Sequence, residues 1–243
     1  MIILSIGMPR AGSGWYYNLT NDIMLAGGAQ DARIIRQRYR LQKILTEVNC
    51  NIGALTPRRM LAVMLPSALG NTFVIKAHAA PTPFALRLIR TGSVCPAYIY
   101  RDPRDALLSA LENGQRARQR GRPNAFSDLV DVPSGIEFML EYLRIWQGWE
   151  ACPQALKARY ENLLIDYDAE AERLAAHLGQ DPRSPVMQQV IARYRPEKAQ
   201  TDQKGLHFSQ GKIGRFRQKM TTEQQEQMNQ AFAPYLEKMG YPL

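Results

Sequence analysis

Cysteine is scarce in this chain, and its few cysteines form neither a metal-binding pattern nor a disulfide framework. The 243 residues contain three, Cys50, Cys95 and Cys152, which are widely spaced and include no C-x-x-C pair. Such a set is typical of buried free thiols in a reducing compartment. His, Asp and Glu also show no spacing typical of a metal site. We therefore expect a cytoplasmic protein without a metal cofactor.

Long hydrophobic runs are missing as well. No window approaches about eighteen uninterrupted apolar residues, which excludes a membrane span. The N-terminal apolar stretch has no basic segment before it, which argues against a signal peptide. An apolar content of 45% and a mean hydropathy of −0.34 are typical of a soluble globular protein. Because neither an internal repeat nor a linker interrupts the chain, we expect a single domain over residues 1–243.

Positive charge is in excess. The formal net charge is +9 and the isoelectric point is near 9.6, which predicts an anionic partner. Basic residues cluster between Arg33 and Lys43 and between Arg116 and Arg122. Either cluster has the ordinary explanation of a solvated face. Neither interleaves aromatic residues as a single-strand binder does, so we expect no nucleic-acid partner.

Short apolar runs alternate with helical patterns along the chain. Residues 2–7, Asn71–Lys76 and Cys95–Tyr100 have the length of buried strands, and Lys157–Leu164 is a weaker strand candidate. This alternation predicts an α/β fold with a central parallel sheet flanked by helices. Residues 114–133 and 195–214 lack a clear period, and the second stretch resembles a long functional loop or lid. The expected helices are Gly14–Leu25, Asp31–Thr46, Pro83–Arg90, Pro103–Gln119, Ser134–Cys152, Asp168–Leu178 and Thr221–Met239.

A glycine-rich turn follows the first strand and opens a helix. Gly7, Gly12 and Gly14 allow a close backbone approach, and Arg10 adds a positive charge. Helix N–H groups at such a turn form an anion site, so we expect a phosphate there. The turn is not a nucleotide P-loop, because Ser13 stands where that motif has lysine, and it does not match G-x-G-x-x-G. The alternative explanation is an ordinary tight strand-to-helix turn.

Three other segments carry chemistry. Lys76 and His78 lie at the end of the second strand, where alternation by two puts both on one face. The third strand ends at Arg101-Asp102-Pro103-Arg104-Asp105, in which Asp102 suits an N-cap and Asp105 resembles the second member of a capping box. The last segment, Phe208–Arg217, is basic and contains two glycines. Taken singly, each also has a structural explanation, namely a strand end, a helix cap and a surface turn.

Together these segments resemble the sulfotransferase superfamily, whose members use 3′-phosphoadenosine 5′-phosphosulfate (PAPS). Pro9-Arg10-Ala11-Gly12-Ser13-Gly14-Trp15 resembles the family's phosphosulfate loop, and Lys76-Ala77-His78 its K-T-H segment. Arg101 to Ser109 resembles R-N-P-[KR]-D-x-x-x-S, Tyr160-Glu161-Asn162 resembles Y-E-D, and Gly211 to Thr221 matches the spacing of the family's last motif. The five motifs occur in the family's order between residue 2 and about residue 222.

The resemblance implies a P-loop-NTPase-like sulfotransferase fold and transfer of a sulfuryl group from PAPS, leaving PAP, to a hydroxyl or amine of a small-molecule, carbohydrate or peptide acceptor. It departs from the cytosolic branch at Ser209-Gln210, which stand for Arg-Lys, so Arg215 or Arg217 are candidates to complete the 3′-phosphate clamp. A P-loop-type kinase and a non-catalytic basic binding protein remain alternatives. The implied catalytic residues are His78, Lys76 and Arg10, and the implied cofactor-binding residues are Arg10, Ala11, Gly12, Ser13, Gly14, Trp15, Arg101, Ser109, Tyr160, Gln210, Gly211 and Lys212.

Overall fold

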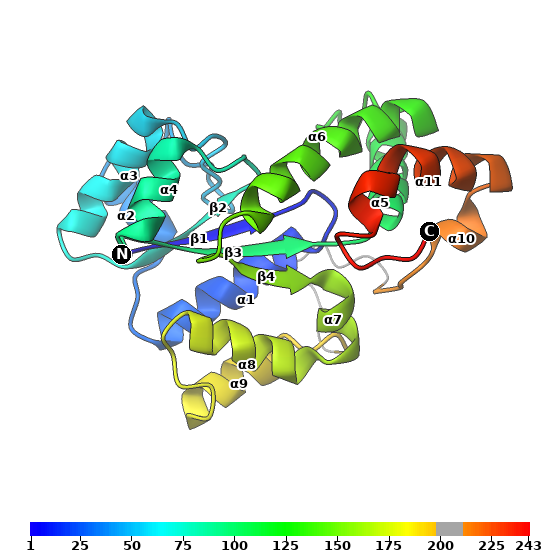
Figure 1. Cartoon of the computed structure of the whole chain (residues 1–243). Coiled ribbons are helices and arrows are strands. Elements are labelled where there is room, and N and C mark those ends of the chain that lie inside the picture. Colours follow the sequence, from blue (N-terminus) through cyan, green and yellow to red (C-terminus); the bar gives the residue numbers. More distant parts are fainter. Residues whose placement is uncertain (198–210) are drawn as a thin grey trace.

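A four-stranded, fully parallel sheet forms the centre of the molecule (Figure 1). The computed structural model describes residues 1–197 and 211–243. The strands are β1 (Ile2–Gly7), β2 (Phe73–Ala77), β3 (Val94–Tyr100) and β4 (Leu156–Arg159), in the spatial order β2-β1-β3-β4. The expected α/β class is confirmed. Because β1 lies between β2 and β3, the strand order reverses there, and such a reversal is where open parallel sheets bind ligands.

Helices cover both faces of this sheet. In Figure 1, α1, α8 and α9 lie on one side of it and α4 and α6 on the other. Within the described part of the chain, no helix is long and apolar enough to cross a membrane. The helices are α1 (Ser13–Ala26), α2 (Ala32–Arg38), α3 (Pro57–Ala68), α4 (Pro83–Arg90), α5 (Pro103–Gln119), α6 (Val132–Glu150), α7 (Tyr160–Ile165), α8 (Tyr167–His177), α9 (Pro185–Arg193), α10 (Phe216–Lys219) and α11 (Thr222–Leu236).

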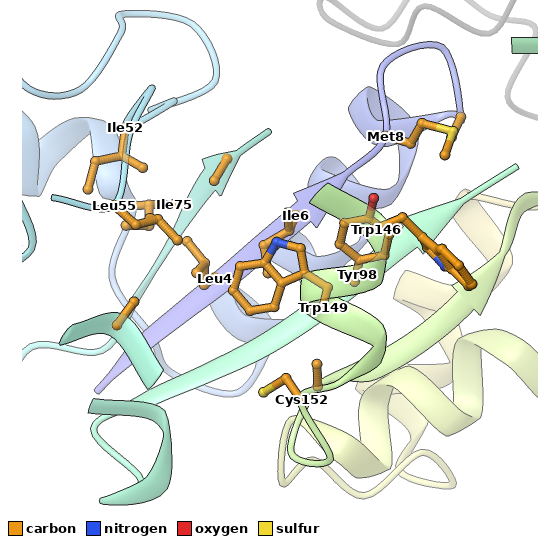
Figure 2. Packing of buried hydrophobic residues seen from close by; sticks show 14 of the residues in the cluster. Leu4, Ile6, Met8, Ile52, Leu55, Ile75, Tyr98, Trp146, Trp149 and Cys152 are labelled. Atoms are coloured by element: carbon orange, nitrogen blue, oxygen red, sulfur yellow. The ribbon is translucent and has the colours of Figure 1, made fainter. Parts of the chain in front are cut away.

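Alternate strand residues supply two hydrophobic clusters, one on each face. Ile3 and Val74 pack with α1, α8 and α9, whereas Leu4 and Ile75 belong to the opposite cluster. Figure 2 shows this second cluster, with Trp146 and Trp149 of α6 close to β1 and β3. The rings of Tyr98 and Trp149 stack at 6.3 Å. Burial on both faces explains why the strands are near-continuous apolar runs.

Two expected elements differ from the structure. The strand expected over Lys157–Leu164 ends at Arg159, and Tyr160 begins α7. The helix expected over Asp31–Thr46 ends at Arg38, because Arg40 adopts a left-handed backbone with φ 55°. Helices α3 and α9 were not expected. In α3 an internal proline, Pro66, opposes the helix locally. α9 has only nine residues, so its periodic pattern is short.

A buried polar cluster joins the start of α5 to the C-terminal part of the chain. Arg104, 1% exposed, donates to both carboxylate oxygens of Asp102, at 3.0 and 2.8 Å. It also donates to Asn229 Oδ1 and to the carbonyl of Pro242, each at 2.8 Å. Its guanidinium lies over the Phe216 ring, 4.5 Å from the centroid. This single side chain therefore connects the end of β3 with α10, α11 and the C-terminal tail.

We expect Arg104→Ala to lower the free energy of unfolding by about 3–5 kcal/mol, because it leaves the Asp102 carboxylate buried without its cation. Urea unfolding followed by circular dichroism measures the loss. The matched control is Arg90→Ala on the exposed end of α4, which should stay within about 0.5 kcal/mol of the parent. A loss of less than about 1 kcal/mol for Arg104→Ala would contradict the structural role given to this arginine.

Candidate functional site

The segments singled out from the sequence meet at one edge of the sheet. Each of the four strands ends there, so the turn after β1, His78 after β2, Arg101 after β3 and Tyr160 after β4 become neighbours. They surround a cavity of about 270 Å³. Its lining residues are Pro9, Arg10, Gly12, Ser13, Gly14, Trp15, Asn49, Asn51, Lys76, His78, Arg101, Ser109, Phe126, Tyr160, Gly211, Lys212 and Arg215.

The turn between β1 and α1 is a close-fitting cradle. Gly12 has φ 74°, and a Cβ there would lie 2.7 Å from the Tyr160 ring. A Cβ on Gly7 would lie 2.5 Å from the Ser13 Cβ, so both positions require glycine. Ser13 and Gly14, at the start of α1, line the cavity, and N–H groups at the start of a helix have no carbonyl partner within it. The turn can therefore bind an anion through its backbone.

One residue of this turn stays outside the cavity. The Ala11 side chain is fully buried in the hydrophobic core, and its N–H donates to the carbonyl of Met8 at 3.2 Å. Trp15, in contrast, lines the cavity, and its indole N–H donates to the carbonyl of Tyr194 at 3.0 Å. The Trp15 ring also stacks on Tyr167 at 5.8 Å. The indole is therefore held in place by α8 and by the end of α9.

The geometry around His78 selects one tautomer of its imidazole. Nδ1 lies 2.5 Å from the carbonyl oxygen of Gly7, which can only accept, so Nδ1 carries the proton. Burial and the nearby Lys76 lower the pKa of His78 to about 4, which keeps the ring neutral at physiological pH. Just beyond it, the Trp149 indole donates to the carbonyl of Ala79 at 2.9 Å and anchors the chain. Nε2 is then left with a lone pair that can accept a proton.

Lys76 supplies a positive charge in the same cavity. It lies in β2, is 7% exposed and is directly opposite Ser5 in the parallel register. Burial, followed by repulsion from Arg10, lowers the pKa of Lys76 to about 8. The ammonium form therefore still predominates at neutral pH. An anion bound beside Lys76 would raise this pKa and complete the protonation.

Arg10, Arg101 and Ser109 form a polar corner at the start of α5. Arg10 Nε donates to Ser109 Oγ at 3.1 Å, and Arg101 donates to the Arg10 carbonyl at 3.4 Å. The Arg101 guanidinium lies 4.6 Å from the centroid of the Tyr160 ring. Its Nε is buried and has no hydrogen-bond partner among the described residues. Because Arg101 also lines the cavity, its guanidinium can contact an anionic ligand there.

Asp105 holds the C-terminal side of the cavity in place. Its carboxylate accepts from the backbone N–H groups of Gly214, at 2.7 Å, and Phe216, at 3.0 Å. It also pairs with Arg101 at 3.3 Å. The expected capping box is therefore wrong, since Asp102 caps α5 through the Arg104 N–H while Asp105 points toward a different segment. A carboxylate at that helix position is drawn to the unpaired N–H groups of the C-terminal loop.

The last motif of the sequence is only partly within the described residues. Gly211 and Lys212 line the cavity, and the Lys212 carbonyl accepts from Arg101 at 2.9 Å. Gln210 and the neighbouring Ser209 lie outside the described residues. Of the two arginines considered as substitutes, Arg215 lines the cavity and pairs with Glu112, whereas Arg217 is exposed and lies against Phe216. Arg215 is thus better placed than Arg217 to contact an anion in the cavity.

Three lining residues were not singled out from the sequence. Asn49 and Asn51 flank Cys50, and Phe126 lies in the irregular stretch after α5. They belong to no motif, and only the folded arrangement brings them to the strand ends. Among residues 1–197 and 211–243, no group of three His, Cys, Asp or Glu side chains could hold a metal ion.

A family model described as the sulfotransferase domain matches residues 2–240. The chain belongs to this sulfotransferase family. Solved structures with the same fold include retinol dehydratase with androsterone and inactive PAP, at 18% identity, TM-score 0.62, covering 97% of this chain and 80% of that one. A mouse sulfotransferase with PAP has 13% identity and TM-score 0.63, covering 97% of this chain and 84% of that one. No curated protein sequence matches significantly.

For this sulfotransferase, we expect His78 to stay a neutral Nδ1–H imidazole from about pH 8 down to about pH 5. Because the folded-state pKa lies at about 4, the proton binds only as the pH falls toward that value. Two-dimensional ¹H–¹⁵N NMR of the imidazole nitrogens reports both tautomer and midpoint, and His78→Gln assigns the signal. A midpoint near the ordinary value of about 6.5, or an Nε2–H tautomer, would contradict the geometry.

Proposed function

We propose that this protein is a sulfotransferase that transfers the sulfuryl group of PAPS to a hydroxyl or amine of its acceptor. The observation that carries the proposal is the meeting of three groups in one cavity: the glycine turn, the neutral His78 beside Lys76, and the corner of Arg10, Arg101 and Ser109. Membership of the sulfotransferase family supports it. An anion cradle and a proton acceptor in one cavity suit a group transfer between an anionic donor and a hydroxyl.

The cavity residues fit such a donor. The turn from Gly12 to Gly14 would hold the 5′ side through backbone N–H groups, with Arg10 as a cation, whereas the Ala11 N–H is already used by the Met8 carbonyl. Arg101, whose buried Nε lacks a partner among the described residues, and Ser109 would bind the 3′-phosphate. Gly211 and Lys212 would bind on the same side, and Gln210, the third cofactor-binding residue expected in this segment, lies outside the described residues. Tyr160 and Trp15 offer flat rings to the adenine.

Bound PAPS would supply an activated sulfuryl group, and the residues of this chain would supply a proton acceptor and positive charge. His78 Nε2 accepts the proton of the acceptor hydroxyl, because Nδ1 is already committed to the Gly7 carbonyl. The Lys76 ammonium and the Arg10 guanidinium offset negative charge that develops during transfer. Negative charge near His78 also raises its pKa from the value of about 4, which makes it a better base.

We further propose that residues 1–243 act as one functional domain and that the protein resides in the cytoplasm. The family model extends over residues 2–240, which supports a single unit. Cys50, Cys95 and Cys152 are all free thiols, and this state suits a reducing compartment.

The first test concerns the cofactor. We expect PAP, with a chelator present, to raise the melting temperature more than AMP or ATP at equal concentration, because only PAP offers a 3′-phosphate to Arg101 and Ser109. A ligand at roughly a hundred times its Kd adds about 2.7 kcal/mol of stability. Differential scanning fluorimetry measures the shifts. Equal shifts for PAP and AMP would contradict the 3′-phosphate site, and a magnesium-dependent preference for ATP would favour a kinase.

The second test concerns the base. His78→Ala should lower kcat by about 10²–10⁴ while leaving PAP binding in place, because the variant loses the proton acceptor but keeps the residues proposed to hold the cofactor. Nitrophenol acceptors should lose less, since their hydroxyls give up a proton more easily. Initial rates of PAP release and calorimetric PAP titration separate the two effects. Near-normal rates with every acceptor tried would place the base elsewhere.

A further inference from the structure

Asn49 and Asn51 line the cavity but take no part in the cofactor binding or proton transfer proposed above. Their segment pairs with the edge of β2 at Lys76 itself. The Lys76 N–H donates to the Cys50 carbonyl at 3.2 Å, and the Ile52 N–H donates to the Lys76 carbonyl at 2.9 Å. Both asparagines are therefore fixed beside the strand end that carries His78.

Cys50 separates the two asparagines and points into the core. Its side chain is fully buried in the core, while its neighbours on either side, Asn49 and Asn51, both line the cavity. Its backbone is left-handed, with φ 46°, which is uncommon for a residue other than glycine. Such a conformation persists where the surrounding structure enforces it, and it is concentrated at functional sites. The turn at Cys50 therefore places a carboxamide-bearing residue on each side of it in the cavity lining.

The side chains of Asn49 and Asn51 have hydrogen-bonding groups that no described residue uses. Asn51 Oδ1 accepts from the Gly53 N–H at 2.8 Å, which leaves its amide N–H groups for a ligand. The Asn49 carboxamide makes no hydrogen bond to any residue within 1–197 and 211–243. A carboxamide both donates and accepts, so it matches hydroxyl groups, which do the same. Phe126 lines the same cavity and adds apolar surface beside the Arg10 guanidinium, which lies 5.6 Å from the centroid of its ring.

The charges of the cavity and of PAPS favour a neutral acceptor over an anionic one. Five cationic side chains line the cavity, and the pairs Arg101–Asp105 and Arg215–Glu112 bring in two carboxylates. The net charge of about +3 is more than offset by PAPS, which carries about four negative charges. No cation among the described lining residues is then left over for an anionic acceptor.

We propose that the acceptor is a neutral, polyhydroxylated molecule of the sugar or polyol class, held through Asn49 and Asn51 against Phe126. This inference rests on the proposed sulfotransferase function and adds the class of its acceptor. One hydroxyl of the acceptor is presented to His78, while others bond the two carboxamides. An apolar alcohol would leave the Asn49 carboxamide and the Asn51 amide N–H groups unpaired, which is unfavourable in a desolvated site.

The test measures binding before turnover. Saturation-transfer NMR on the protein with bound PAP is run with a panel of neutral methyl glycosides and inositol, the corresponding uronates, and apolar alcohols of similar size. Initial rates with PAPS are then measured for the same panel. Asn49→Ala and Asn51→Ala should each raise KM for the bound glycosides by about tenfold, with PAP affinity unchanged. Gln37→Ala, which removes an exposed carboxamide of α2 outside the cavity, is the matched control.

Binding and sulfation of neutral glycosides or inositol, weakened in both asparagine variants and not in the control, supports the inference. Binding of apolar alcohols or uronates in preference to every neutral polyol overturns it while leaving the proposed function intact. Unchanged KM in both asparagine variants also overturns it. Failure of the parent protein to bind PAP overturns the proposed function itself, so the two failures are distinguishable.

Discussion

The carboxylate of Asp105 is the interaction on which the cavity depends. It accepts from the Gly214 and Phe216 N–H groups and pairs with Arg101, so one buried anion holds a C-terminal segment against a residue at the end of β3. Arg101 in turn donates to the carbonyls of Arg10 and Lys212. Without Asp105, a buried arginine and two backbone donors would lack their partner, at a cost typical of broken buried networks.

A second buried network, also of hydrogen bonds, supports this arrangement. Glu161, at the start of α7, accepts from the Asp102 N–H at 3.0 Å and from the Tyr241 hydroxyl at 2.7 Å. Arg104 joins Asp102 to Asn229 and Pro242. The C-terminal helix and tail are thereby fixed to the ends of β3 and β4. The polar residues of the Arg101–Ser109 motif therefore have two roles. Arg101 lines the cavity, whereas Arg104 and Asp105 hold the surrounding segments together.

The first three strands could be predicted from the sequence because buried parallel strands are short apolar runs bounded by turn residues, whereas the end of β4 was placed too late. α4 and α5 begin and end where the helical pattern does, since a proline opens each helix and hydrophobic periodicity runs to its end. The role of Asp105 could not be predicted. The sequence around it predicts a local capping box, whereas in the structure its carboxylate accepts from the N–H of Phe216, far along the chain. Asn49, Asn51 and Phe126 lie in irregular segments, and only tertiary structure brings them to the cavity.

The central claim is that Asp105 organises Arg101 and the Gly211–Phe216 segment for a 3′-phosphate. The most direct measurement is a calorimetric titration of PAP into Asp105→Asn, with the fold checked by circular dichroism. Asparagine keeps the size of the side chain but removes the charge and one acceptor, so PAP should bind at least about tenfold more weakly than to the parent. A folded variant that binds PAP within about twofold of the parent would contradict the account.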